Sequence, residues 1–301
     1  MKQIVQCVPN ISEGRNREIV EAVVASIRGI ADVKLLDWSS DSDHNRSVIT
    51  FVGTPDGVEK AAFALCSTAA QLIDMTVHSG EHPRMGATDV VPFIPIQGVT
   101  MEEAVQLANR VGKRIGEELG IPVYMYEEAA KNASRSNLAD VRRGQYEGLQ
   151  AKLARADGQP DYGPAVFNAR SGATAVGARM PLVAFNVNLG TDNLEIANKI
   201  ARNVRHASGG LKAVKAMGVN LEARGIVQVS MNMVNYKETP LYRVFELIRA
   251  EARRFGVSII GSEIIGLVPL EAMVQSIDYY FGLEGFKMNQ VLETRLWADA
   301  E

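Results

Sequence analysis

The sequence predicts an α/β protein of the α+β class, built from two ferredoxin-like βαββαβ halves. Apolar periodicity gives the same order of strands and helices twice along the chain. A Thr-Pro pair begins a helix in each half, at Thr54 and at Thr239. The length of 301 residues suits two domains of ordinary size.

The first half alternates strands with amphipathic helices. Stretches rich in β-branched residues predict strands at residues 4–8, 33–36, 48–52, 90–96 and 123–126. Apolar residues at helical spacing predict helices between Ile19 and Ile27, after Pro55, and after Thr100. Thr100 and Glu103 also have the spacing of a capping box, which favours a helix start.

The second half repeats this order. Strands are expected at residues 182–189, 211–217, 226–233 and 257–265. Asp192 with Glu195 predicts the start of the first helix. The next helix begins at Pro240 and ends at Gly256, and a last helix covers residues 269–280.

Between the halves, residues 149–177 are rich in glycine, alanine, proline and serine and show poor periodicity. A stretch of this length without regular structure predicts a functional loop or a linker. We therefore expect an N-terminal subdomain of residues 1–178 and a C-terminal subdomain of residues 179–301.

Composition narrows the possible partners. The 32 basic and 35 acidic residues give a net charge of −3, which argues against a nucleic-acid partner but leaves room for a small basic pocket. No uncharged apolar stretch is long enough to span a membrane, and the first residues lack a signal-peptide core. Cys7 and Cys66 have apolar neighbours and are expected to be buried thiols in a cytoplasmic protein.

The densest polar cluster covers residues 78–86. His78 and His82 have the spacing of a zinc-binding pair on one helix face. Gly80 disfavours a helix, however, and Pro83 keeps His82 out of the helical conformation. We therefore expect no metal site here.

This cluster is either a structural loop or a catalytic one. Glu81 and Arg84 flank His82 and can set its protonation, which favours His82 as a general acid or base. His44 also belongs to a predicted loop, whereas His206 at the end of a helix is expected to be structural.

A second polar cluster, residues 37–46, suits a solvated hairpin loop and lacks the pattern of a calcium loop. Residues 172–177 contain two glycines, but the Lys-Ser/Thr pair of a phosphate loop does not follow them. The chain also lacks G-x-G-x-x-G and G-x-S-x-G motifs. Nucleotide hydrolysis and serine-triad chemistry are therefore disfavoured.

Several motifs, in order along nearly the whole chain, resemble the glutamate formimidoyltransferases, the formiminotransferase domain family found also in formiminotransferase-cyclodeaminase. Among them, the sequence GEHPRMG at residues 80–86 is rather specific. The other segments that carry the resemblance are residues 7–14, 45–47, 121–124, 161–164, 172–174, 184–189 and 266–270.

The resemblance implies two α/β subdomains whose sheets face each other and hold substrate between them. It implies a transferase of one-carbon metabolism, acting in histidine degradation, that moves the formimino group of N-formimino-L-glutamate to N5 of tetrahydrofolate and releases L-glutamate. Tetrahydrofolate is then a co-substrate, and no metal is implied. The catalytic histidine of the family matches His82. The folate-binding segment matches Gly163, Pro164, Ala165, Val166, Phe167, Asn168, Ala169, Arg170, Ser171 and Gly172.

One histidine near neutral pKa can take a proton from N5 and then give one to the departing nitrogen. Its ring could be oriented by Glu81, Asp37 or Asp41, because the acid expected in some relatives is replaced here by Ser39. This choice stays open.

Both substrates carry carboxylates, which arginine binds through two parallel hydrogen bonds. Arg46 and Arg84 are the candidates for formiminoglutamate, and Lys212 is a candidate for the folate tail. Asn10 and Asn188, at matching strands of the two halves, are further candidates for substrate binding.

Three other functions stay open: formyl transfer from 5-formyltetrahydrofolate on the same scaffold, a non-catalytic folate- or amino-acid-binding protein, and a structural subunit of a larger assembly. Because the sequence stops at Glu301, we expect no cyclodeaminase activity. The expected partners are small molecules, not nucleic acid or a membrane, and a homodimer is left open.

Overall fold

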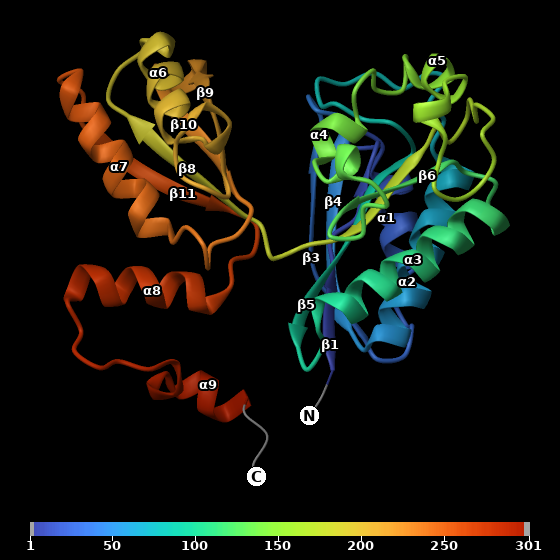
Figure 1. Cartoon of the computed structure of the whole chain (residues 1–301), viewed down its shortest axis with the longest axis horizontal. Coiled ribbons are helices and arrows are strands. Elements are labelled where there is room, and N and C mark those ends of the chain that lie inside the picture. The colour runs from blue at the N-terminus through green and yellow to red at the C-terminus, as the bar shows by residue number, and fades with distance from the viewer. Residues whose placement is uncertain (1–2, 298–301) are drawn as a thin grey trace. The chain divides into compact units, whose positions relative to one another are not determined.

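The computed structural model describes residues 3–297, and the chain divides after Arg179 into two compact units (Figure 1). Both units combine a β-sheet with helices, so the predicted α+β class with two subdomains is confirmed. Within the described part of the chain, no helix has the length and apolarity that crossing a membrane requires.

The first unit begins with a βαββαβ arrangement. Its elements are β1 (Ile4–Cys7), β2 (Asn10–Ile11), α1 (Arg17–Ala25), β3 (Val33–Asp41), β4 (Arg46–Gly53), α2 (Pro55–Leu72) and β5 (Thr88–Gln97). β1 and β2 together form one interrupted strand that pairs antiparallel with β4 on one side and β5 on the other. β3 pairs with the outer side of β4, which completes the ferredoxin-like strand order.

The remaining elements of this unit extend the sheet. They are α3 (Met101–Glu118), β6 (Val123–Glu127), the short helices η1 (Ala133–Arg135), α4 (Leu138–Val141), α5 (Leu149–Leu153) and η2 (Ala156–Gly158), and β7 (Thr174–Ala178). β7 lies between β5 and β6 and is parallel to both. The first unit is therefore a ferredoxin-like core with two added parallel strands.

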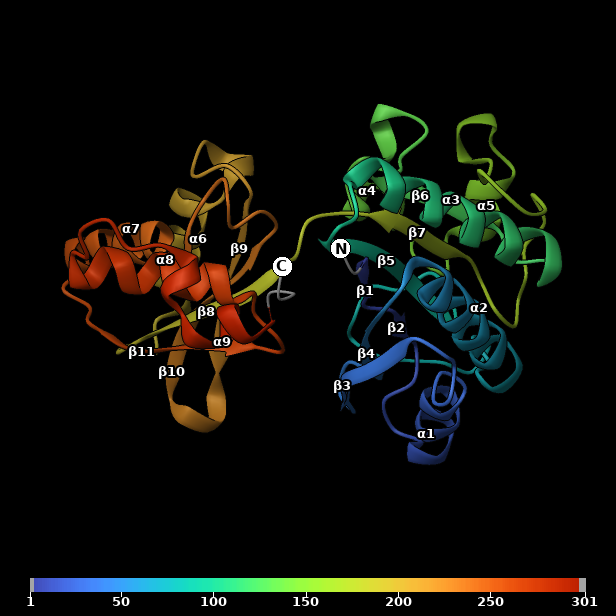
Figure 2. The same cartoon turned by 90° about the horizontal axis from the view of Figure 1, so that it is seen from below.

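Helix starts in the first unit follow the predicted capping signals. The side chain of Thr54 accepts a hydrogen bond from the backbone N–H of Gly57 at 3.2 Å, directly before Pro55 begins α2. Thr100 and Glu103 form the predicted capping box of α3. α2 and α3 then lie side by side on one face of the sheet (Figure 2).

The two faces of this sheet differ in chemistry. Val5, Cys7, Phe51 and Phe93 point to the helices and form a fully buried apolar core with them. The opposite face carries mostly polar residues. On this face, Asp37 of β3 pairs with Thr50, Ser39 with Val48, and Asp41 with Arg46. Asn10 of β2 pairs with Val48 from the other side. Residues paired in this way share a face, so the sheet presents a polar surface away from its core.

The second unit repeats the ferredoxin-like order without added strands. Its elements are β8 (Val183–Leu189), α6 (Leu194–Val204), η3 (His206–Ser208), β9 (Val214–Leu221), η4 (Glu222–Arg224), β10 (Ile226–Met233), α7 (Leu241–Arg254), β11 (Ile259–Ile265), α8 (Leu270–Phe281), η5 (Met288–Gln290) and α9 (Leu292–Trp297). The antiparallel sheet has the order β11-β8-β10-β9, and α6 and α7 pack on its apolar face.

Residues 149–177 are more ordered than expected. They contain α5, η2 and most of β7, so the prediction of a structureless loop or linker was wrong for these parts. β7 has the sequence TAVGA, whose small residues fit between two strands: a Cβ on Gly177 would lie 2.6 Å from the ring of Tyr126. Small residues carry little hydrophobic signal, which is why periodicity missed this strand.

Other local predictions need correction. β3 continues to Asp41, because Ser40 and Asp41 pair with Ser47 and Arg46, so the expected loop shortens to residues 42–45. Asn193, and not Asp192, caps α6 by accepting the backbone N–H of Glu195 at 3.0 Å.

Thr239 does not cap α7 as Thr54 caps α2. Its hydroxyl instead donates to the backbone carbonyl of Lys212 at 2.5 Å. Gly256 does follow the end of α7 with a left-handed backbone, as predicted. Both cysteines are buried and free, also as predicted.

Candidate functional site

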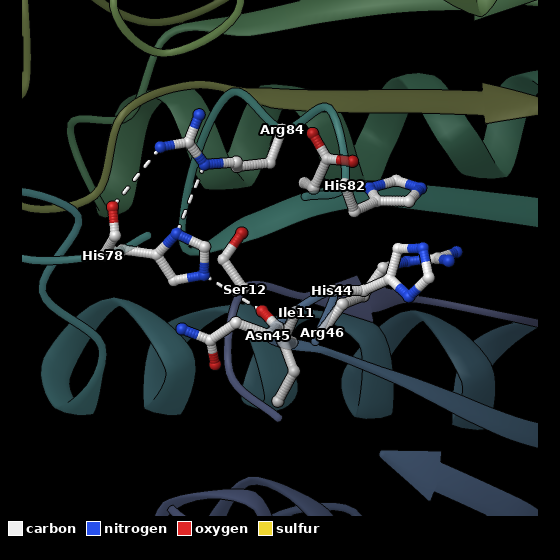
Figure 3. Close-up of a pocket in the computed structure, with 9 residues that line it drawn as sticks. Ile11, Ser12, His44, Asn45, Arg46, His78, His82 and Arg84 are labelled. Atoms are coloured by element: carbon white, nitrogen blue, oxygen red, sulfur yellow. Dashed lines mark hydrogen bonds between the residues drawn. The ribbon is translucent and has the colours of Figure 1, made fainter. Parts of the chain in front are cut away.

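A pocket in the first unit brings together side chains from four separate segments (Figure 3). Its lining comes from β2 and the residue after it, the β3–β4 hairpin, the loop between α2 and β5, and the start of β5. The residues are Ile11, Ser12, His44, Asn45, Arg46, His78, His82, Arg84 and Asp89.

Glycines allow these segments to approach closely. A Cβ on Gly80 would lie 2.3 Å from the backbone oxygen of His44, so the α2–β5 loop can only pack on the hairpin because residue 80 is glycine. A Cβ on Gly86 would lie 2.4 Å from the backbone oxygens of Ser171 and Ala173. These contacts bring His82, between the two glycines, against the hairpin that carries His44 and Arg46.

Arg46 is a cation in the lining of the pocket. Its guanidinium donates to the side-chain oxygen of Asn10, which is itself buried. Burial lowers the pKa of Arg46 to about 10, with Arg142 adding a smaller repulsion. The Nε atom of Arg46 is buried and has no hydrogen-bond partner in the described part of the chain, so this guanidinium keeps unused donor capacity.

Asp89 and Arg142 form a buried ion pair behind Arg46. One carboxylate oxygen of Asp89 accepts the backbone N–H of Met85 at 2.8 Å, and the other accepts from Arg142. Among residues 3–297, the Nε atom of Arg142 also has no hydrogen-bond partner. Asp89 pairs with Arg142, and Arg46 lines the pocket as a cation that suits an anion.

The guanidinium donors of Arg84 are occupied by other side chains of the protein. It forms two parallel hydrogen bonds with the carboxylate of Glu147, at 2.9 and 2.7 Å. Its Nε donates to Nδ1 of His78 at 3.2 Å. The fork of Arg84 thus holds the pocket wall together, and its side chain is only 9% exposed.

His78 is locked as a neutral ring. Its Nδ1 accepts from Arg84, so its Nε2 carries the proton and donates to the backbone oxygen of Asn45 at 2.9 Å. Burial lowers its pKa, which favours this neutral form. With both nitrogens engaged, His78 is a structural link between the loop and the hairpin.

His82 has a different environment. No side chain among the described residues hydrogen-bonds its half-buried ring. Burial lowers the pKa of His82 to about 3, and the positive charges of Arg46 and Arg142 add to this effect. The ring is therefore a neutral imidazole at pH 7, next to two cations and exposed to the pocket.

The carboxylates expected to orient His82 do not hydrogen-bond it. Asp41 pairs with Nδ1 of His44 at 3.0 Å. Asp37 and Glu81 are exposed, and no hydrogen bond joins either side chain to His82 within residues 3–297. The proposed orienting role thus has no support in these contacts, although Asp37 and Asp41 do lie on the polar sheet face with Arg46.

The predicted folate-binding segment, residues 163–172, touches the pocket wall without lining the pocket. Gly172 pairs with Gly86, and the backbone oxygen of Ser171 accepts the N–H of Ala87 at 2.9 Å. Phe167 packs against Tyr146 with 5.5 Å between ring centroids, and Val166 is 68% exposed. The segment therefore presents exposed backbone and an apolar side chain beside the α2–β5 loop.

Asn188 and Lys212 belong to the second unit. The side-chain oxygen of Asn188 accepts from Gln228 at 2.8 Å, and Gln228 also donates to Glu263. Lys212 is exposed and forms an ion pair with Glu238. Since the two units are described separately, these residues are not placed relative to the pocket.

Sequence reasoning missed Asp89, Arg142 and Glu147. Asp89 had a local signal, because a carboxylate directly before the buried run of β5 needs a buried partner. Arg142 and Glu147 had none, since the polar segment between β6 and β7 shows no pattern that relates it to the pocket. No group of three or more potential metal ligands occurs among residues 3–297.

Comparisons with known proteins agree with this arrangement. Residues 4–179 match the formiminotransferase domain, N-terminal subdomain, and residues 184–294 match the formiminotransferase domain. The chain is 53% identical to a glutamate formimidoyltransferase from Streptococcus pyogenes, over 98% of this chain and 99% of that protein.

A glutamate formimidoyltransferase from Thermoplasma acidophilum is 48% identical over 97% of both chains. A formimidoyltransferase-cyclodeaminase from Mus musculus is 46% identical over 93% of this chain but only 53% of its own length. These matches confirm the resemblance predicted from the motifs. The chain therefore belongs to the formiminotransferase family.

Proposed function

We propose that this protein is a glutamate formimidoyltransferase that moves the formimino group of N-formimino-L-glutamate to N5 of tetrahydrofolate and releases L-glutamate. The observation that carries the proposal is full-length similarity to two proteins of that name, at 53% and 48% identity. The pocket supports it, because a neutral imidazole beside excess positive charge suits proton transfer on a substrate that carries carboxylates.

The reaction needs two proton transfers. N5 of tetrahydrofolate attacks the amidine carbon and must lose its proton, and the glutamate nitrogen must gain one before the carbon–nitrogen bond breaks. We assign His82 as the base, since its ring is neutral at pH 7 and its nitrogens are not held by other side chains of the described residues. Its family counterpart is the catalytic histidine implied by the GEHPRMG motif.

The bound substrate is expected to tune this base. An imidazole whose pKa is about 3 is a weak base, because the optimum lies near the working pH. Formiminoglutamate carries two carboxylates, and their charge offsets that of Arg46 and Arg142. Substrate binding therefore raises the pKa of His82 toward neutrality and activates the base only in the complex.

We assign the substrate carboxylate to Arg46, with Arg142 behind it. Arg46 lines the pocket, and both guanidinium groups act on His82 through their charge, which supports this assignment. Arg84, the other arginine expected in this role, has its fork occupied by Glu147, so we assign it to shaping the pocket. Asn10 holds Arg46 by accepting from its guanidinium.

We assign folate to residues 163–172 of the first unit. Lys212 and Asn188 of the second unit are proposed separately as ligand-binding residues. The exposed backbone at 163–166 and the half-buried ring of Phe167 suit a flat, partly apolar ring system. Lys212 is a cation for the glutamate tail, and Asn188 has an amide that can hydrogen-bond a ligand.

One assay tests the function. The protein is mixed with tetrahydrofolate and either formiminoglutamate or formylglutamate, and glutamate release is followed. The proposal expects release with formiminoglutamate that depends on tetrahydrofolate. Release from formylglutamate alone would assign formyl transfer instead, and no release above the folate-free control would contradict a transferase.

A further inference from the structure

His44 lies in the pocket beside His82, and the transfer steps assigned to His82 do not involve it. The two rings are 6.2 Å apart between centroids and meet edge to face at 66°. Figure 3 shows them together on one side of the pocket, whereas His78 lies on the other side with its hydrogen bonds to Arg84. Besides His78, the pocket therefore holds two further imidazoles, those of His44 and His82.

Asp41 contacts the His44 ring, and the two side chains are 54% and 48% exposed. A carboxylate oxygen of Asp41 lies 3.0 Å from Nδ1 of His44, so Nδ1 carries a proton and donates it to this oxygen. The other oxygen accepts the backbone N–H groups of Asp43 and His44 at 2.9 and 2.8 Å. These bonds, chiefly that from the His44 backbone, lower the pKa of Asp41 and keep it ionised.

The remaining nitrogen of His44, Nε2, has no hydrogen-bond partner among residues 3–297. It is thus the atom that can exchange a proton with a ligand in the pocket. A carboxylate that accepts from Nδ1 fixes the tautomer of the His44 ring and so leaves Nε2 as the nitrogen that exchanges protons. His82 has different surroundings, because burial lowers its pKa and the charges of Arg46, Arg142 and His44 add to this effect.

This contrast assigns two roles to the two rings. Resting on the proposed transfer reaction, we propose that His44 is a second acid–base residue, which protonates the departing glutamate nitrogen, and that Asp41 is its positioning residue. Two neighbouring imidazoles with different hydrogen-bond partners suit a reaction that needs one proton removed and one proton supplied.

The reaction then has two bond changes and two proton transfers. N5 attacks the amidine carbon, the carbon–N5 bond forms, and the N5 proton passes to His82. The bond from carbon to the glutamate nitrogen then breaks, and that nitrogen takes the proton from Nε2 of His44. His82 ends protonated and His44 neutral, and a proton transfer between the two neighbouring rings, directly or through solvent, restores the starting state.

The charged groups around His44 come from three segments. Asp41, Asp43 and Arg46 belong to the hairpin, and Arg15 contacts it by donating to the backbone oxygen of Ser42 at 2.8 Å. The α2–β5 loop contributes His82 and Glu81, whose backbone N–H donates to Asp43. Of these, the carboxylate of Asp41 is the one in direct contact with the ring.

The test compares His44→Gln with His206→Gln, which changes an exposed histidine of the second unit. We expect kcat of His44→Gln to fall about 100-fold, within the usual range for a general acid. The KM values of both substrates and the affinity for tetrahydrofolate should change less than threefold. The alkaline limb of the pH–kcat profile should disappear, because that limb reports the group that must be protonated. His206→Gln should match the wild type.

A second pair of variants guards against misfolding. Imidazole added to His44→Ala should restore part of kcat, which a purely structural defect would not show. Asp41→Asn should lower kcat about tenfold and move the alkaline limb to lower pH, with KM unchanged.

The inference is wrong if His44→Gln keeps kcat within threefold of the wild type. It is also wrong if kcat falls but the alkaline limb persists and imidazole gives no rescue, and a wild-type profile in Asp41→Asn would remove the positioning role. A wild-type protein that releases no glutamate would instead contradict the proposed function, before any variant is compared.

Discussion

The two units share one strand order but only one of them builds the pocket. In each unit the fourth strand of the ferredoxin-like core, β5 or β11, follows a helix. The connection into β5 covers residues 73–87 and carries His78, His82 and Arg84. The connection into β11 covers only residues 255–258. His78, His82 and Arg84 thus reside in the longer connection, whereas His44 and Arg46 come from the β3–β4 hairpin.

The matching asparagines show the same difference. Asn10 and Asn188 occupy corresponding strands, and both are buried on the face opposite the helices. Asn10 binds the cationic Arg46, whereas Asn188 binds the neutral amide of Gln228, which continues to Glu263. The corresponding asparagine therefore contacts an arginine in the first unit and an amide network in the second.

In this protein, the shared strand order and the residues that form the pocket can therefore vary independently. The strand order fixes where a polar face lies, and the loops and the residues on that face decide what it can bind. Variants in corresponding places of the two units can test this separation.

The largest effect is expected at His82. His82→Asn should lower kcat about 1,000-fold, because a general acid–base residue contributes roughly 10²–10⁴ in rate. Tetrahydrofolate affinity, measured by calorimetry, should stay within threefold. The comparison variant His206→Asn in the second unit should keep full activity, and a His82→Asn protein with more than a tenth of wild-type kcat would rule out the assigned base.

The next effect is expected at Arg46. Arg46→Gln removes a charged donor worth about 1.5–3 kcal/mol to a carboxylate, so KM for formiminoglutamate should rise about 10- to 100-fold. Because Arg46 lowers the pKa of His82, the pKa of His82 followed by NMR should rise in the variant. Arg254→Gln, at an exposed arginine of α7, should change neither quantity. An unchanged KM for formiminoglutamate would show that Arg46 does not bind the substrate.

A smaller effect is expected from added volume. Gly80→Ala places a Cβ 2.3 Å from a backbone oxygen of the hairpin, so the loop must shift, at a cost of about 1–3 kcal/mol. We expect roughly tenfold lower kcat and a lower melting temperature. Gly261→Ala, where the nearest atom is 3.9 Å away, should leave both unchanged within error. If the two variants have the same kcat and melting temperature, the close approach of the loop to the hairpin at residue 80 is not required for the geometry of the pocket.

The smallest effect concerns pH and stability. The pKa of His82 is about 3 in the folded chain and near 6.5 in an unfolded one, so the unfolded chain binds more protons between these values. Stability should therefore fall as pH decreases through this window, and the lowered pKa of His78 acts in the same direction. The drop in melting temperature between pH 7 and pH 5 should be smaller in His82→Gln than in the wild type. The reverse order would contradict a neutral, buried His82.

Local patterns predicted most elements because their signals lie within a few residues. Thr54 and Thr100 cap their helices, and residues 226–233 form a strand with the predicted bounds. β7 was missed because its small residues are chosen by the strands on either side of it. The loop at residues 78–86 was identified as a candidate site. None of the carboxylates proposed to orient His82, however, hydrogen-bonds its ring among residues 3–297.

The sequence by itself determined the α+β class, the two subdomains, the loop that carries His82 and the family, since each rests on short-range periodicity or on a contiguous motif. Only the tertiary structure decided which charges meet. Arg84 binds Glu147 and Arg142 binds Asp89 across more than fifty residues of chain, and His44 meets His82 from another loop. Contacts of that separation leave no periodic trace, because folding and not spacing brings the partners together.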